Sequence, residues 1–104
     1  MKITDIDTIM IDSPGRKWTI LRVHTDEGLV GLGEATYSQK EPVVCAAVEH
    51  MKKDLIGEDP ARIEYLWHKV WRISSHTGIW RMHGPIWMSA MSGIDQALWD
   101  IKGK

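Results

Sequence analysis

The sequence predicts an α+β fold in which a three-stranded antiparallel meander is followed by three helices. The first third of the chain alternates apolar and polar residues between short Gly-containing turns, which is typical of strands. The remaining two thirds place apolar residues at helical spacing. A chain of 104 residues is long enough for one domain, so we assign residues 1–104 to a single unit.

The strand predictions rest on β-branched residues and on turn chemistry. Ser13–Lys17 carries Pro14 and Gly15 and is expected to turn the chain, and Gly28 marks the second turn. Gly31 and Gly33 lie on one face of the third strand, where another element must approach closely. The expected strands are residues 2–12, 18–25 and 29–36.

The helices follow in the second part of the chain. The first begins either with a capping box from Ser38 to Glu41 or directly at Glu41, with Pro42 in the first turn. Asp59 is expected to cap the second helix. The second helix has the clearest amphipathic pattern, with an apolar stripe of Ile63, Leu66, Trp67, Val70 and Trp71.

The third helix, predicted over residues 86–102 within a final segment of 85–104, is apolar on nearly all sides. Such a helix is buried on more than one side. Its stripe covers the meander, but Ala97 and Trp99 lie on the flanks and have no evident partner in these residues. We therefore expect Trp99 to be exposed here and to be covered by a further domain that this helix leads into.

Composition excludes several classes of protein. The net charge of -1 gives no electrostatic basis for binding nucleic acid or an anionic membrane. Apolar runs are far shorter than the roughly 18 residues of a membrane span, and acidic residues interrupt the N-terminal segment, unlike a signal peptide. Cys45 is the only cysteine, so no internal disulfide is possible, which favours a cytoplasmic location. Cys45 itself is expected to be a small core residue.

Six Trp and no Phe form an unusual aromatic set, and four of the Trp lie between Trp67 and Trp87. This cluster indicates a core, an interface or a ligand wall. The segment between the second and third helices holds His76, Arg81 and His83 and is either a ligand contact or a subunit contact.

The chain shows no catalytic constellation and no set of metal ligands. Asp95 lies beside the apolar stripe of the third helix, so we expect its carboxylate to be paired by a salt bridge or a backbone N–H. Glu34 receives the same interpretation. No catalytic or metal-binding residue is therefore assigned to this chain.

The stretches TDEGLVGLGEAT, LIGEDPARIEYLW and WRMHGPIWMSAMSGIDQALWDIKGK resemble the N-terminal capping region of the enolase superfamily, in its mandelate racemase / muconate lactonizing enzyme group. The resemblance extends in order over essentially the whole chain. Within the group, the sequence looks most like acid-sugar dehydratases of the D-galactonate type. It implies a capping domain over a (β/α)-barrel that is not part of these residues. It also implies that the barrel binds one Mg²⁺ and supplies the acid and base groups, in a homo-oligomeric enzyme acting on an aldonate.

By this resemblance, the loops that select substrate correspond to Ser13–Trp18 and Thr36–Lys40. Ser38 stands where some mannonate dehydratases have Asn, which argues against mannonate as the substrate. The residues expected to contact substrate are Trp18, Tyr37, Arg81 and His83. A racemase or cycloisomerase of the same superfamily remains an alternative, as does a free-standing module that binds a partner through its Trp-rich helices.

Overall fold

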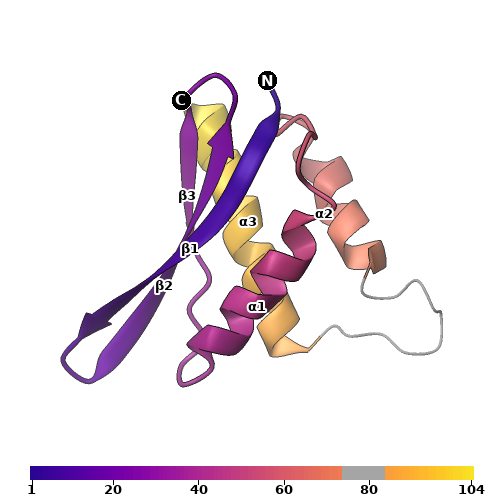
Figure 1. The fold of residues 1–104 in the computed structure, drawn as a ribbon. Helices are drawn as coiled ribbons and strands as arrows, with labels where there is room; N and C mark the ends of the chain where they lie inside the picture. The colour runs from indigo at the N-terminus through magenta and orange to yellow at the C-terminus, as the bar shows by residue number, and fades with distance from the viewer. Residues whose placement is uncertain (74–83) are drawn as a thin grey trace.

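The structure, a computed structural model, describes residues 1–73 and 84–104 and confirms the predicted α+β fold. A three-stranded sheet lies on one side of the molecule; the first and third helices pack against one of its faces, and the second helix packs against the third (Figure 1). The elements are β1 (Ile3–Ser13), β2 (Arg16–Thr25), β3 (Val30–Glu34), α1 (Glu41–Lys52), α2 (Ile63–Ile73) and α3 (Pro85–Gly103).

The sheet is an antiparallel meander in the order β1-β2-β3. Its first hairpin is longer than the sequence indicated, because Ser13 and Arg16 already pair across it. The expected turn over Ser13–Lys17 was therefore too long, and only Pro14 and Gly15 form the turn. Gly15 has a φ of 76°, the left-handed conformation that allows so short a connection. The hairpin tip projects beyond β3, at the end remote from both marked termini (Figure 1).

The second of the two expected starts for α1 is confirmed, whereas the expected capping of α2 by Asp59 is wrong. α1 begins at Glu41 with Pro42 in its first turn, and its N-cap, Lys40, makes no side-chain capping bond. The prediction for α2 was wrong by several residues. The Ala61 N–H donates to Asp59 Oδ1 at 2.9 Å, so Asp59 holds a separate turn that ends before the helix begins at Ile63.

The core lies between the sheet and the helices. Thr19, Leu21, Val23 and Thr25 alternate along β2 and turn their buried side chains towards the helices. α1 contributes Val44, Val48 and Met51 to the same core. Three Trp, at positions 67, 71 and 87, pack partly buried at its border. Cys45 is only half-buried, so the expectation of a core cysteine was wrong.

α3 lies unusually close to β3, as the strand glycines predicted. A Cβ atom at Gly31 would overlap the Ala97 carbonyl oxygen, and one at Gly33 would overlap that of Gly93. Ala97 is fully buried, so the expectation that it lacks a partner in this chain was wrong. Trp99 is 54% exposed, as predicted, and Lys102 Nζ lies 4.9 Å from the centre of its ring.

Polar side chains of α3 occupy the free edge of β3. The Glu34 N–H donates to Gln96 Oε1 at 3.1 Å, and the Leu32 N–H donates to Asp100 Oδ2 at 2.9 Å. Lys104 Nζ donates to the Val30 carbonyl oxygen at 2.7 Å. Gln96, Asp100 and Lys104 are four residues apart and so lie along one helix face. This polar row satisfies edge groups that would otherwise be open to another strand.

Candidate functional site

An open hollow separates the tip of the β1–β2 hairpin from the segment that connects β3 to α1. Its volume is about 990 Å³, counted out to the solvent. The hollow brings together the two segments, Ser13–Trp18 and Thr36–Lys40, that the sequence assigned to substrate selection. The lining residues are Asp12, Ser13, Gly15, Arg16, Lys17, Ser38, Gln39, Glu41 and Pro42.

The lining is polar and carries both signs of charge. Arg16 and Lys17 come from the start of β2, and Ser38 and Gln39 from the connection. Glu41 is only 5% exposed, but its carboxylate oxygens are not among the buried side-chain atoms that lack a partner, which in the described residues are Thr19 Oγ1 and Trp87 Nε1. Such an arrangement suits a small ligand that carries hydroxyl and carboxylate groups, because both groups need donors and acceptors when they leave water.

Two of the four residues expected to contact substrate, Trp18 and Tyr37, do not line the hollow. Trp18 is half-buried on the sheet face opposite the helices, with the Arg16 guanidinium 4.8 Å from its ring centre. Tyr37 is half-buried and packs against the core. Arg81 and His83 lie outside the described residues. The predicted segments thus contribute to the lining of the hollow, and their role in binding stays a prediction. The burial of Glu41 was not predicted, because its spacing from Ser38 suggested only a capping box.

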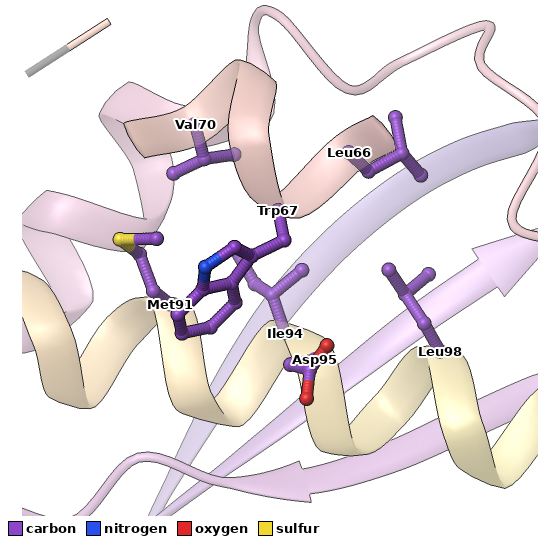
Figure 2. A pocket seen from close by; sticks show the side chains of 7 residues that line it. All are labelled: Leu66, Trp67, Val70, Met91, Ile94, Asp95 and Leu98. Atoms are coloured by element: carbon purple, nitrogen blue, oxygen red, sulfur yellow. The ribbon is translucent and has the colours of Figure 1, made fainter. Parts of the chain in front are cut away.

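A second, smaller cleft of about 220 Å³ lies between α2 and α3. Figure 2 shows the Asp95 carboxylate beside the Trp67 ring, among the apolar side chains of Leu66, Ile94 and Leu98. Burial raises the pKa of the Asp95 carboxyl above its ordinary value. The expected salt bridge or backbone N–H bond to Asp95 is absent among the described residues, so that prediction was wrong for this part of the chain.

Glu34 also differs from its expected role. Its side chain is exposed, and only its backbone groups contact α3, through Gln96. On the open face of the sheet, Arg22 forms two bonds to the Asp7 carboxylate, at 2.9 and 2.7 Å. These bonds hold the pKa of the Asp7 carboxyl below its ordinary value.

Neither a metal-binding cluster nor a membrane-spanning helix is found in residues 1–73 and 84–104. Within them, no three His, Cys, Asp or Glu side chains are grouped so that they could hold a metal ion. The Mg²⁺ that the resemblance implies is therefore not accounted for by these residues. None of the helices in this part of the chain combines the length and apolar character that a membrane crossing requires.

Comparison with known proteins gives the family. The model of the mandelate racemase / muconate lactonizing enzyme N-terminal domain matches residues 7–104. The chain belongs to this family. It is thus an N-terminal domain of the enolase superfamily, as its sequence motifs indicated.

Curated relatives of this N-terminal domain include two bacterial D-galactonate dehydratases. The protein from Pectobacterium atrosepticum is 47% identical over all 104 residues, and that from Verminephrobacter eiseniae is 45% identical over the same length. In both comparisons the chain spans 25% of the relative's length.

Solved structures agree with this assignment. An enolase from Pantoea ananatis with bound D-gluconate and Mg is 43% identical, with a TM-score of 0.86 over 98% of this chain and 24% of that one. A member of the enolase superfamily from Salmonella Typhimurium is 34% identical, with a TM-score of 0.85 over 98% of this chain and 26% of that one.

Proposed function

We propose that this N-terminal domain caps the active site of a Mg²⁺-dependent acid-sugar dehydratase and takes part in choosing the substrate. The observation that carries the proposal is the hollow between Asp12–Lys17 and Ser38–Pro42, which joins the two segments assigned to substrate selection. The D-galactonate dehydratases at 47% and 45% identity support the reaction class. The Pantoea ananatis structure with D-gluconate and Mg supports an aldonate and this metal.

In such a reaction a base removes the proton α to the substrate carboxylate, a general acid protonates the β-hydroxyl so that it leaves as water, and the enol that results tautomerises to the α-keto acid. A divalent ion bound elsewhere in the protein would stabilise the negative charge of the substrate carboxylate and the charge that develops when the α-proton is removed. The described residues take the supporting part. They cover the polyol chain of the substrate and exclude water from the reacting atoms.

Within the hollow, the cationic and acceptor groups have distinct uses. Lys17 and Arg16 attract the anionic substrate, and Ser38 and Gln39 offer both donors and acceptors to its hydroxyl groups. The Glu41 carboxylate, which also lines the hollow, is placed to accept a hydrogen bond from a substrate hydroxyl. We further propose that Trp18 and Tyr37 support the two segments, and that the enzyme is a cytoplasmic homo-oligomer.

The test is a turnover assay on the complete protein with a panel of aldonates, with and without Mg²⁺. We expect the α-keto acid product to appear for at least one aldonate and to be lost when EDTA is added. Exchange of the α-proton with solvent deuterium without loss of water would instead identify a racemase. Ring closure or opening of an unsaturated acid would identify a cycloisomerase. Neither outcome is compatible with the dehydratase proposal.

A further inference from the structure

We propose that Asp12 is a specificity-determining residue, which makes the hollow accept an uncharged end of the substrate and reject a second acidic group. The expected substrate is a sugar acid with one carboxylate, and the matching acid with a carboxylate at both ends is excluded. This inference rests on the proposed function, because it takes the hollow as the place where the substrate is covered.

Asp12 lies beside Lys17 in the lining of the hollow. The two residues pair directly across β1 and β2, so their side chains lie on the same face of the hairpin. Thr19, two residues beyond Lys17, is fully buried on the helix side, which places Lys17 and Asp12 on that side as well. Asp12 is exposed, and its carboxylate makes no hydrogen bond or ion pair with the described residues. Its charge is therefore available to act on a ligand.

The charges around this pair do not cancel. Glu41, in the first turn of α1, adds a second carboxylate to the lining, and the partial positive charge of the helix N-terminus offsets it only in part. Arg16 attracts anions at longer range, because its guanidinium lies 4.8 Å from the ring centre of Trp18, on the sheet face opposite the helices. Lys17 is thus the cation that faces two carboxylates, and an anion inside the hollow meets an excess of negative charge.

A sugar acid enters the hollow by the end that is remote from its reacting carboxylate. The proton is removed next to that carboxylate, where the divalent ion would also act, and no cluster of metal ligands is found in residues 1–73 and 84–104. In an aldonate the remote end is a hydroxymethyl group, which can donate a hydrogen bond to a carboxylate. In an aldarate the remote end is a second carboxylate, which has no proton to donate at neutral pH and is repelled by Asp12 and Glu41. The lining thus acts against the wrong substrate as well as for the right one.

The experiment compares wild type, Asp12→Asn and Asp12→Lys in the complete protein with Mg²⁺. The probes are two pairs of acids that differ at the remote end alone: D-galactonate with galactarate, and D-gluconate with D-glucarate. Discrimination is measured as the ratio of kcat/KM for the two acids of a pair. Should the protein bind these acids without turnover, calorimetry gives the ratio of the two dissociation constants instead. Asp54→Asn is the matched control, because Asp54 lies after α1 and does not line the hollow.

We expect wild type and the control to prefer the aldonate alike. Asp12→Asn should reduce this preference roughly five-fold, which is the effect of one exposed charge. Asp12→Lys should reduce it further, because attraction replaces repulsion. Added salt should weaken the preference of wild type more than that of Asp12→Asn, because salt screens a charge and leaves the shape of the hollow unchanged.

Three outcomes would overturn the proposal: a wild type that accepts both acids of each pair equally, an Asp12→Asn variant that discriminates like wild type, or a control that loses the preference to the same extent. Binding of the acids without loss of water would contradict the dehydratase proposal, and the ratio of dissociation constants would then decide the role of Asp12. Because Asp12 is exposed, neither replacement disturbs the core, and thermal unfolding of each variant confirms this.

Discussion

Gly33 of β3 and Gly93 of α3 are packed so closely that no side chain fits between them. A Cβ atom on Gly33 would overlap the Gly93 carbonyl oxygen, and one on Gly93 would come within 2.9 Å of the Ala35 Cβ. The clash at Gly33 is with backbone, which cannot rotate away as a flexible side chain can. This contact sets the distance between the sheet and its longest helix.

Gly33→Ala should therefore lower the free energy of unfolding by about 3 kcal/mol, at the upper end of ordinary overpacking. Gly103→Ala is the matched control. Nothing lies within 4 Å of a Cβ at Gly103, and alanine favours the helix there. Urea unfolding measures both changes. Equal stability of Gly33→Ala and wild type would contradict the close packing of α3 on β3.

The sequence was sufficient to predict the meander, the three helices and the need for a close neighbour at Gly31 and Gly33. It could not identify that neighbour, because the approach of α3 to β3 is a tertiary contact. For this reason the sequence placed Ala97 on a flank of the third helix that has no partner within these residues. The exposure of Trp99 was predictable, since the helix has more apolar faces than the rest of the chain can cover.

The two segments predicted to select substrate do line one hollow, and their role in binding stays a prediction. Pro14 and Gly15 located the hairpin tip, but the sequence did not show that pairing continues to Ser13 and Arg16. The orientation of the Trp18 side chain follows from that register, which places it on the sheet face opposite the helices. Glu41 was missed because its burial depends on how α1 packs, and a spacing of three residues from Ser38 cannot reveal that.

Asp7→Asn should make the protein less stable at neutral pH and less sensitive to acid. Arg22 lowers the pKa of the Asp7 carboxyl in the folded state, so its stabilisation is complete above the unfolded pKa, near 4. This stabilisation is lost as the pH falls towards the lower folded pKa. Because the pair is about one third exposed, we expect about 1 kcal/mol or less at neutral pH. Unfolding curves between neutral pH and pH of about 2 test this.

Asp95→Asn should change the stability at neutral pH in the opposite direction, by raising it. Burial raises the pKa of the Asp95 carboxyl, so the charged form opposes folding above the folded pKa and this penalty disappears as the pH falls through it. The variant should therefore be more stable than wild type at neutral pH, and the difference should shrink in acid. Chemical unfolding at several pH values measures the difference. A loss of stability at neutral pH would show that Asp95 has a partner outside the described residues.

Lys17→Met should impair substrate binding if the hollow covers an anionic substrate. We expect KM for the preferred aldonate to rise by roughly ten-fold, with a smaller change in kcat, because Lys17 acts on binding and not on the reacting atoms. Lys53→Met is the control, since Lys53 is exposed at the end of α1 and remote in sequence from both segments. Steady-state kinetics of both variants measure KM and kcat and so test this prediction. An unchanged KM for Lys17→Met would argue against the hollow as a binding surface.

The polar row of Gln96, Asp100 and Lys104 has a mechanical consequence. These side chains fasten α3 to the whole length of β3, and β3 is in turn paired with β2, which runs on to the hairpin tip. Sliding α3 along the strand would break all of these hydrogen bonds together. It would also move Gly93 and Ala97 away from Gly33 and Gly31, the β3 residues on which they pack. The helix and the sheet consequently move as one rigid body. A tilt imposed at the Lys104 end of α3 should therefore tilt β3 and the part of β2 that is paired with it, from Ile20 to His24.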